Sequence, residues 1–460
     1  MDLVQEPVQA KSRLAERIQS LLGHESPGSE RTIIRVAVDI DAMDPLAWLA
    51  AQPHATKVYW CGRDHNVQFA GVGVAAEEPA TADAQALLQH LRSQSATDSG
   101  VRWFGGFSFA GQDDAALAVD SEWDWYRSGR FIVPRFELIS EHEKYYLACN
   151  LTCSSEAVTF DDIQTALNDL DAICDRLPAP DMRLPAVESR NDTPGAKLWT
   201  ETVDAALEAI QFGHLNKVVL ARRTDLKLTG ELSTTALLHG LREDTHHCFL
   251  FYFQPHAGTS FFGATPELLY RRNGRQLTCE AVAATRPRGE SQNEDLTLGL
   301  ELMQSSKDRR EHQFVTDHIT QALEPLCSDF EADAPTVLKL ARIQHLQQHF
   351  DATLAVETTD ADILGALHPT PAVGGSPRGA ALAWLKEYEA FNRGAYASPF
   401  GWINHDAAEF AVAIRSALYD HGTVSLYAGA GIVEGSVAET EWAELNSKIE
   451  TFRRLLGAPR

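Results

Sequence analysis

The sequence has few residues that could form disulfides or a structural metal site. Its 460 residues include seven cysteines, an odd number, and no two of them form a Cys-x-x-Cys pair. A disulfide framework or a structural zinc site usually shows an even or closely spaced set of cysteines. We therefore expect reduced, buried thiols and neither disulfides nor structural zinc.

A long apolar run is also missing. No stretch approaches the roughly 18 consecutive apolar residues that cross a bilayer as a helix. The first 19 residues contain no apolar segment of the kind that forms the centre of a secretory signal. We therefore expect a cytoplasmic protein that has no membrane partner.

Positive charge is scarce. The chain has 40 Lys and Arg against 64 Asp and Glu, which gives a formal net charge of -24 at pH 7. This balance argues against binding to nucleic acid. The whole protein would also repel an anionic small molecule, but screening over about 8 Å at physiological salt leaves the outcome to local charges. A site for such a ligand must therefore contain its own cations.

The chain is long enough for a large core, and its 44% hydrophobic content is that of an ordinary globular protein. Residues 178–195 are rich in proline and polar side chains and are the one linker that the pattern predicts. Residues 1–195 mix helical and strand patterns and contain no reactive cluster. We interpret them as scaffold and residues 196–460 as the ligand-binding portion of one intertwined domain.

The strongest local pattern lies in residues 424–448. A strand pattern leads into Gly429 and Gly431, and the missing Cβ of these residues lets the backbone pass close to another group. A helical pattern follows, in which Ser436 and Glu439 have the spacing of a capping box. A glycine turn beside an acidic helix suits a small anionic ligand that is bound through a metal.

Acidic residues recur three positions apart on two predicted helices, one at 294–326 and the other after Ser436. The pairs are Asp308 with Glu311 and Glu441 with Glu444, and Lys448 shares the face of the second pair. Two facing pairs would form a four-carboxylate cage for a hard cation. Mg²⁺ is the best candidate, because it takes one or two carboxylates directly and keeps several waters. The alternative is two solvated helix faces, one of them with an ion pair.

Two residues have the chemistry of a general base and a general acid. Lys217 opens the apolar strand 217–222, and a lysine can act as a base near neutral pH where desolvation favours its neutral form. Glu267 follows Pro266 at a break between strands, and a carboxylic acid in an apolar site keeps its proton. Taken alone, each residue also fits a simpler interpretation, a lysine that reaches solvent from a strand end and a solvated turn.

Two histidines do not fit a metal site. His345 and His349 would share a face only on a helix, but their segment has a strand pattern. The glutamate of a His-Glu-x-x-His motif is also absent. We interpret both histidines as structural.

Five spaced segments, taken together, resemble the chorismate-utilising enzymes, and within them the isochorismate synthases. The segments are Lys-Val-Val-Leu-Ala-Arg at 217–222, residues 263–267, residues 308–312, His-Pro-Thr-Pro at 368–371, and residues 428–448 with their Glu-Trp-x-Glu core. The resemblance covers roughly residues 198–455. It implies an α+β protein with the aminodeoxychorismate synthase-like fold, in which two large, mostly antiparallel or mixed sheets pack face to face with helices outside.

The resemblance also implies roles for individual residues. Lys217 matches the base that activates water, and Glu267 matches the acid that protonates the departing 4-hydroxyl. The residues that match metal ligands are Glu311 and Glu444, which bind Mg²⁺ directly, and Asp308 and Glu441, which hold metal-bound waters. The residues that match substrate-binding groups are Thr285, His368, Tyr396, Arg415, Gly429, Gly431 and Lys448. Two local departures are Ala284, where the family commonly has glycine, and Val437-Ala438, where proline is common.

The implied reaction is attack of water on C2 of chorismate with loss of the C4 hydroxyl, which gives isochorismate. Mg²⁺, Arg415 and Lys448 would offset the two substrate carboxylates locally, against the net charge of -24. Aminodeoxychorismate synthases carry a nucleophilic lysine where this chain has Ala283, so that activity is not expected. Anthranilate synthases carry Pro-Ala-Gly-Thr in place of residues 368–371.

Several alternatives remain beside isochorismate synthase. Salicylate synthase shares the same machinery and adds pyruvate elimination, and anthranilate synthase is less favoured. A non-catalytic chorismate-binding regulator would be expected to have lost Lys217, Glu267 or a metal carboxylate, and all are present. We expect no glutaminase subunit and a monomer. The sequence leaves open whether the product supplies menaquinone or a siderophore.

Overall fold

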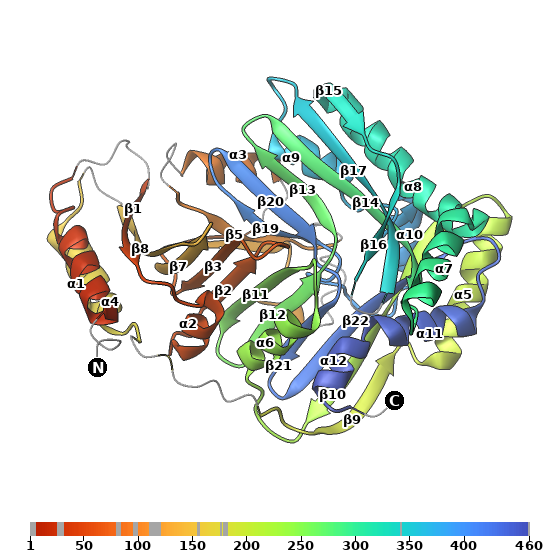
Figure 1. The fold of residues 1–460 in the computed structure, drawn as a ribbon, viewed down its shortest axis with the longest axis horizontal. Helices are drawn as coiled ribbons and strands as arrows, with labels where there is room; N and C mark the ends of the chain where they lie inside the picture. The colour runs from red at the N-terminus through yellow and green to blue at the C-terminus, as the bar shows by residue number, and fades with distance from the viewer. Residues whose placement is uncertain are drawn as a thin grey trace.

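The computed structural model describes residues 6–24, 32–79, 84–94, 100–109, 121–153, 157–174, 177, 183–340 and 343–458. Within these residues the chain forms two large β-sheets in which all strand pairs are antiparallel, and helices lie around the sheets (Figure 1). This is the α+β architecture that the resemblance implies. None of the helices in the described ranges is long and apolar enough to cross a membrane.

The larger sheet has twelve strands in the order β1-β8-β7-β3-β2-β11-β12-β21-β22-β10-β18, and β9 also pairs with β10. Their bounds are β1 Thr32–Ile40, β2 Lys57–Cys61, β3 Val67–Val72, β7 Phe136–Glu141, β8 Lys144–Cys153, β9 Val187–Thr193, β10 Lys217–Leu228, β11 Phe249–His256, β12 Thr259–Thr265, β18 Gly375–Ser376, β21 Ser416–Asp420 and β22 Thr423–Ile432.

The smaller sheet has ten strands in the order β15-β17-β14-β13-β20-β19-β5-β6-β4, and β16 also pairs with β17. Their bounds are β4 Ala76–Pro79, β5 Trp103–Phe107, β6 Gly129–Val133, β13 Leu268–Asn273, β14 Gln276–Pro287, β15 Cys327–Ala332, β16 Thr336–Lys339, β17 Ile343–Leu354, β19 Pro399–Ile403 and β20 Ala407–Val412.

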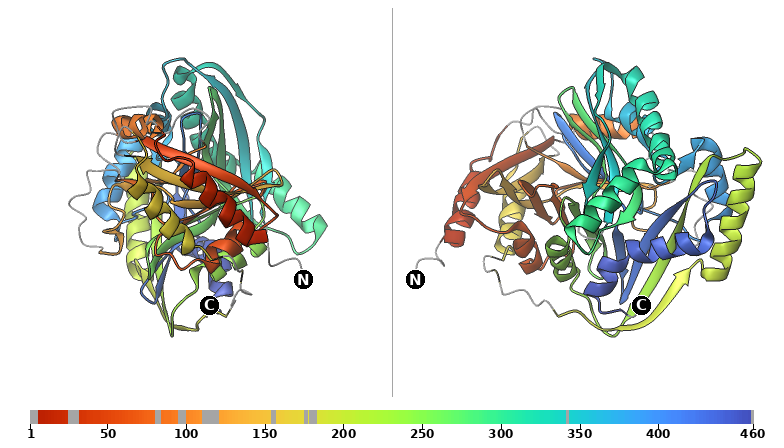
Figure 2. Two further views of the ribbon diagram at one scale, coloured as in Figure 1. Left: turned by 90° about the vertical axis from the view of Figure 1, so that its left-hand side faces the viewer. Right: turned by 45° about the vertical axis from the view of Figure 1, so that its right-hand side comes forward.

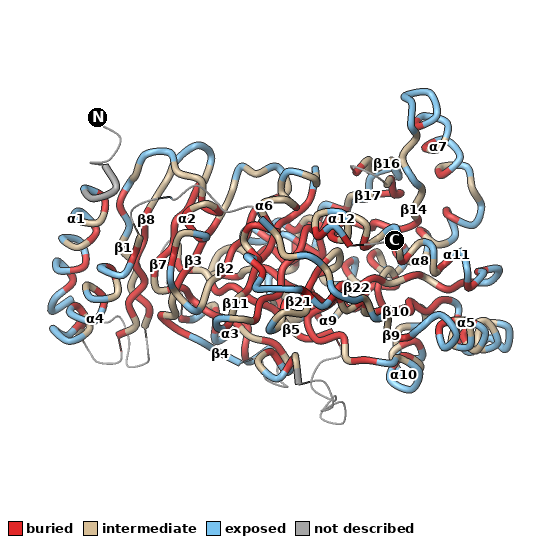
Figure 3. The backbone as a smooth tube through the Cα atoms, turned by 90° about the horizontal axis from the view of Figure 1, so that it is seen from below, coloured by how far each residue is buried: buried red, intermediate tan, exposed pale blue. Residues whose placement is uncertain are grey.

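Helices cover the outside of the two sheets. Their bounds are α1 Glu6–Gln19, α2 Pro45–Ala51, α3 Ala84–Ser93, α4 Phe160–Asp171, α5 Ala196–Gln211, α6 Thr234–Asp244, α7 Gln292–Gln304, α8 Ser306–Leu323, α9 Asp360–Leu367, α10 Arg378–Tyr388, α11 Ala438–Lys448 and α12 Glu450–Leu455, with short 3-10 turns at Ser121–Trp123 and Glu324–Leu326. The helices α1 and α4 lie side by side at the end of the molecule formed by β1 and β8 (Figure 2). Exposed residues concentrate on the outward faces of helices such as α1 and α5, and buried residues follow the strands (Figure 3).

The two sheets pack face to face through aromatic side chains. Phe251 on β11 lies 5.2 Å, between ring centroids, from Phe400 on β19, and Phe69 on β3 lies 5.9 Å from Phe104 on β5. Offset and tilted ring pairs of this kind stabilise a core beyond the area that they bury. The strands of the two sheets therefore enclose one continuous core.

Both sheets draw strands from each side of residue 195. In the larger sheet β2 pairs with β11, and in the smaller sheet β5 pairs with β19. The prediction of a linker at 178–195 is wrong for its last part, because Val187–Thr193 forms β9 and hydrogen-bonds along β10. Polar residues are tolerated there because β9 is an edge strand with one side toward solvent.

The predicted long helix at 294–326 is two helices, α7 and α8, which meet at Ser305. The backbone of Ser305 is extended, and its hydroxyl accepts a hydrogen bond of 3.3 Å from the amide of Asp308. A serine in this position caps the helix that follows and ends the one before it. On α8, Asp308, His312, Val315 and Ile319 are buried at helical spacing, so one face of the helix points inward.

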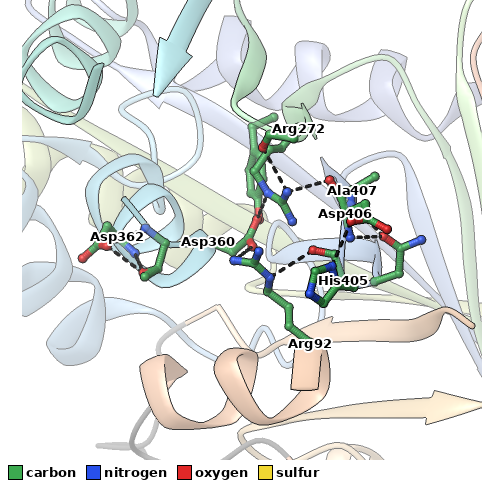
Figure 4. Close-up of polar contacts among 11 residues, drawn as sticks. Arg92, Arg272, Asp360, Asp362, His405, Asp406 and Ala407 are labelled. Atoms are coloured by element: carbon green, nitrogen blue, oxygen red, sulfur yellow. Dashed lines mark hydrogen bonds and ion pairs between the residues drawn. The ribbon is translucent and has the colours of Figure 1, made fainter. Parts of the chain in front are cut away.

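A buried ionic cluster ties α3 to α9 and to the strands of the smaller sheet (Figure 4). Asp360, at the first turn of α9, accepts a hydrogen bond of 2.8 Å from Arg272 on β13 and lies 3.5 Å from Arg92 on α3. The Arg272 guanidinium also donates to the carbonyl of Asp406 at 2.8 Å, and Arg92 donates to that of His405 at 3.3 Å. Asp360 is 1% exposed, so its charge depends on these partners.

Asp360→Ala should therefore destabilise the protein by about 3 kcal/mol or more, because it leaves the buried Arg272 charge without its carboxylate. Asp362→Ala, two residues along the same helix, is the matched control, since exposed Asp362 only completes the capping box with Thr359 and should cost about 1 kcal/mol. The measurement is the midpoint of urea unfolding. Equal shifts for the two variants would contradict the assignment.

Candidate functional site

A cavity lies where both sheets meet α8 and α11. Its wall combines β10 and β22 of the larger sheet, β14 and β17 of the smaller sheet, and the crossing between β12 and β13. The lining residues are Val219, Pro266, Glu267, Val282, Ala283, Ala284, Thr285, Glu311, His345, Ala372, Val373, Tyr396, Ile414, Arg415, Tyr427, Ala428, Gly429, Gly431, Glu444 and Lys448. Nine of the residues to which the sequence assigned a catalytic, substrate-binding or metal-binding role are among them.

Lys217 lies beside the wall at the first position of β10 and is 1% exposed. Its ammonium is 3.1 Å from Oε1 of Glu311 on α8. A Cβ at Gly431 would lie 2.9 Å from Cε of Lys217 and 3.0 Å from that Glu311 oxygen, so a glycine is needed for the lysine and the carboxylate to meet. At Gly429 a Cβ would lie 3.0 Å from the Tyr396 hydroxyl. The expected close approach to the β22 backbone is thus present.

Glu267 projects from the crossing between the sheets and is 4% exposed. Burial, together with the charge of Glu280, raises the pKa of Glu267 to about 8, although Lys217, Arg415 and Lys448 act to lower it. The Glu267 carboxyl therefore carries its proton at neutral pH. A protonated carboxyl beside a cavity can donate a proton to a leaving group.

Two carboxylates from α8 and α11, those of Glu311 and Glu444, line the cavity, and Glu441 lies one turn before Glu444 on α11. Glu444 accepts a hydrogen bond of 2.6 Å from Lys448 one turn along α11, as the spacing predicts. Burial acts to raise the pKa of Glu444, but Lys448, together with Arg415 and His345, outweighs it and lowers the pKa. Glu441 is buried, and burial and then the charges of Glu444 and Glu311 raise its pKa. Glu444 and Glu311 are therefore close enough to Glu441 for their charges to act on it.

The fourth predicted acid is held elsewhere. Arg286 donates to Oδ2 of Asp308 at 2.6 Å and 3.2 Å. Within the described ranges, no three His, Cys, Asp or Glu side chains converge closely enough to hold a metal ion. A basic side chain lies against each of the other acids instead: Lys217 with Glu311, Lys448 with Glu444, and Lys307, at 3.8 Å, with Glu441. The hard oxygen donors of Glu311, Glu441 and Glu444 fit a cation such as Mg²⁺, and Asp308 fits it less well.

The predicted capping box on α11 is absent. The N-cap residue is Val437, which makes no side-chain cap bond, and the Ser436 hydroxyl accepts from the amide of Val433 at 3.2 Å. Ser436 instead closes a turn over residues 433–436, in which Gly435 adopts φ 85°. The spacing of Ser436 and Glu439 does not reveal this turn.

Arg415 and Tyr396 supply groups for an anionic ligand. Burial lowers the pKa of Arg415, and no carboxylate of the described residues lies within ion-pair distance of its guanidinium. Arg415 has φ 52°, a conformation that costs a non-glycine residue on the order of 1 kcal/mol or more. Tyr396 stacks on Tyr427 with ring centroids 5.2 Å apart. The wall thus contains an uncompensated cation and a rigidly held tyrosine.

Thr285 lies directly opposite His345 across β14 and β17, because Ala284 is the extra residue of a β-bulge. Ala284 has φ 59°, which accounts for the glycine that the resembling family commonly has there. Nδ1 of His345 is 3.0 Å from the Ala284 carbonyl and 3.1 Å from the Thr285 hydroxyl. Since a carbonyl only accepts, Nδ1 carries the proton and Nε2 is left as an acceptor.

His345 is a site residue that the sequence interpretation assigned a purely structural role. Burial, together with the Arg415 charge, lowers its pKa to about 3, so the ring is neutral. Its Nε2 is buried and has no partner among the described residues. The strand pattern correctly excluded a helical metal motif, but the pairing with Thr285 depends on strand register that no local pattern reveals.

The structure places His368 outside the cavity wall. Its Nε2 is 3.4 Å from the carbonyl of Phe109, and burial lowers its pKa to about 3. The segment 368–371 leads instead to Ala372 and Val373, which line the cavity. Next to this segment the wall is therefore formed by small apolar side chains and not by His368.

Comparisons with known proteins agree with this geometry. Residues 17–457 match the family model described as chorismate binding enzyme. The chain is 31% identical to isochorismate synthase MenF of Escherichia coli (strain K12), over 96% of this chain and 99% of that protein. It is 34% identical to the chloroplastic isochorismate synthase of Catharanthus roseus, over 88% of this chain and 71% of that protein. The solved structure of MenF, the menaquinone-specific isochorismate synthase from Escherichia coli, superposes with a TM-score of 0.86 at 29% identity and covers 98% of this chain and 99% of that chain.

Proposed function

The chain belongs to the chorismate binding enzyme family, and from that premise we propose that it is an isochorismate synthase that converts chorismate to isochorismate. The observation that carries the proposal is the pairing of two groups around one cavity. A buried lysine, Lys217, lies beside the wall, and a carboxyl that holds its proton at neutral pH, Glu267, is part of it. Exchange of one hydroxyl for another needs such a base and such an acid.

In this proposal Lys217, in its neutral amine form, takes a proton from the water that attacks C2, and Glu267 gives its proton to the hydroxyl that leaves C4. The oxygen of water forms a bond to C2 while the bond from C4 to its hydroxyl breaks, and the ring double bonds shift between them. The base gains one proton and the acid loses one, so a proton must return to Glu267 before the next turnover. Nε2 of His345 offers an acceptor for a hydroxyl or water in the same cavity.

The two carboxylates of chorismate need cations, and the cavity supplies them. Arg415 has no carboxylate partner among the described residues, and the Lys448 ammonium donates to the carbonyl of Gly429 at 2.7 Å as well as to Glu444. These local charges act within a Debye length of about 8 Å and offset the net charge of -24 over that distance. We assign Arg415, Lys448 and the Tyr396 hydroxyl to substrate binding.

We further propose that Glu311 and Glu444 bind Mg²⁺ directly and that Glu441 holds a metal-bound water. Burial, and then the negative charges of Glu444 and Glu311, raise the pKa of Glu441, and a cation between these acids would offset that repulsion. Asp308 can join this set only if it leaves Arg286. A bound Mg²⁺ would act as a Lewis acid on a substrate carboxylate and stabilise the charge that develops in the transition state.

Two positions support water as the nucleophile. Ala283 in the wall cannot form a covalent adduct, and the segment 368–371 reads His-Pro-Thr-Pro. We propose that the enzyme works as a monomer and without a glutaminase subunit. Because the similar Escherichia coli enzyme is menaquinone-specific, we place the product in the synthesis of menaquinone.

Purified protein with chorismate and Mg²⁺ alone should yield isochorismate and stop at a mixture of the two compounds, because the exchange of hydroxyls is reversible. The measurement is chromatography of the products over time. Glutamine, ammonium and a second subunit should make no difference.

Two outcomes of the same experiment would contradict the assignment. Salicylate and pyruvate that appear in step with chorismate loss would identify a salicylate synthase, which adds the elimination step. Anthranilate that forms once ammonium is added would show that water is not the nucleophile.

A further inference from the structure

The residue that carries the proposed acid lies where the chain crosses from one sheet to the other. β12 ends at Thr265 in the larger sheet, and β13 begins at Leu268 in the smaller sheet, so Pro266 and Glu267 form the whole crossing. The carbonyl of Glu267 accepts from the amide of Val412 at 3.0 Å, and its amide donates to the Thr265 hydroxyl at 3.4 Å. The remaining backbone oxygen of the crossing is the carbonyl of Pro266.

Arg63 donates to that carbonyl at 2.6 Å. It follows β2, in the part of the chain that the sequence analysis interpreted as scaffold. The same guanidinium makes two hydrogen bonds to Glu280 on β14, at 2.8 Å and 2.7 Å. Its central carbon lies 4.8 Å from the ring centroid of Phe249. Arg63 therefore joins the larger sheet, the smaller sheet and the crossing through one planar group.

The Glu280 side of this contact is itself fixed. Gln347 donates to Glu280 at 3.1 Å, and His349 lies 3.3 Å from it, both on the neighbouring strand β17. Burial acts to raise the pKa of Glu280, but the hydrogen bonds from His349 and Arg63 outweigh it and lower the pKa to about 2. Glu280 thus stays ionised and holds the guanidinium in one orientation, with one of its nitrogens directed at Pro266.

We propose that Arg63 is a positioning residue for Glu267, which fixes the crossing so that the carboxyl meets the leaving hydroxyl. The inference rests on the proposed function and deepens it, because it gives the N-terminal part of the chain a share in the reaction. A hydrogen bond to the carbonyl directly before the acid controls where the acid lies. Misplacement of a reacting group by about 1 Å can lower a rate by 10²-fold.

Arg63→Met should lower kcat by about 10-fold or more and leave KM near that of the wild type. KM should hold because the proposed substrate cations, Arg415 and Lys448, make no contact with Arg63 among the described residues. The control is Arg35→Met, which breaks another buried ion pair, 2.6 Å from Glu137, far from the cavity. Measured below its unfolding temperature, the control should keep the wild-type kcat.

A double-mutant cycle separates positioning from a general structural role. If Arg63 acts through Glu267, Arg63→Met should lower kcat in the wild type but change it less than about twofold in the Glu267→Gln background. An equal loss in both backgrounds would overturn the inference and leave the proposed function intact. If Glu267→Gln alone kept full activity, the proposed function would fail first.

Two further variants cover the case in which Arg63→Met does not fold. Arg63→Met combined with Glu280→Gln removes both buried charges, and we expect it to fold and still show the loss of kcat, because the bond to Pro266 is missing. Arg63→Lys keeps a donor and a charge and should recover part of the rate. A normal kcat in the double variant would overturn the inference, because it would show that the unpaired Glu280 charge, and not the lost bond, lowered the rate.

Discussion

Glu311→Gln should abolish turnover at ordinary Mg²⁺ concentrations, and Glu444→Gln should do the same. Each substitution keeps the size of the side chain and removes the negative charge that a hard divalent cation needs. The fold should remain, because both groups lie at the surface of a cavity and are partly exposed. Glu441→Gln, at a residue proposed to act through a metal-bound water, should cost about 10- to 100-fold.

The measurement is calorimetric binding of Mg²⁺ to each variant, together with activity. Glu434→Gln is the matched control, since Glu434 makes an exposed ion pair with Arg310 of α8, the helix that carries Glu311. It should bind Mg²⁺ and turn over as the wild type does. Full turnover of the wild type in excess EDTA would contradict the proposal that the enzyme needs a bound Mg²⁺.

The lysines around these acids explain how the protein keeps a cluster of carboxylates folded. Lys217, Lys307 and Lys448 each lie within 4 Å of one acid, so each negative charge has a counter-charge within the same chain. Mutual repulsion between like charges is thereby reduced. A divalent cation that binds the acids must compete with these ammonium groups. The prediction above does not depend on that competition, because it follows from the loss of the carboxylate charge alone.

Patterns that depend on neighbours in sequence predicted part of the local geometry around the cavity. The spacing of Glu441, Glu444 and Lys448 placed them on one helix face, and the structure has Lys448 on Glu444. The glycines of β22 were expected to admit another group, and Gly431 admits Lys217 and Glu311. In each case the periodicity of a helix or the absence of a Cβ is a local property.

Two errors are local, the capping box absent from α11 and the break at Ser305 in the predicted long helix. The omissions concern contacts between distant segments. Arg63 meets Glu280 across 217 positions of sequence, and Thr285 meets His345 across 60. Strand register and β-bulges determine which side chains make such contacts, and neither can be recognised from the local sequence. The edge strand β9 was missed for the same reason, because only its pairing with β10 makes a polar segment extended.

Lys217→Ala and Glu267→Gln should each lower kcat by at least the roughly 10²-fold that a positioned proton-transfer group contributes. Chorismate should still bind with a similar KM, because Arg415 and Lys448 are unchanged. Lys227→Ala is the matched control, on the same strand as Lys217 but exposed and paired with Glu188. A near-normal kcat in either variant would remove its assigned role.

The pH dependence of the wild type tests the acid separately. Glu267 must carry its proton to assist the leaving hydroxyl, and burial raises its pKa to about 8. The acid is therefore present below that pH and is lost as pH rises through it, so kcat should fall above about pH 8. The residual rate of Glu267→Gln should lack this fall, because the amide does not titrate. A wild-type kcat that stayed level to pH 10 would contradict the role of Glu267 as the proton donor.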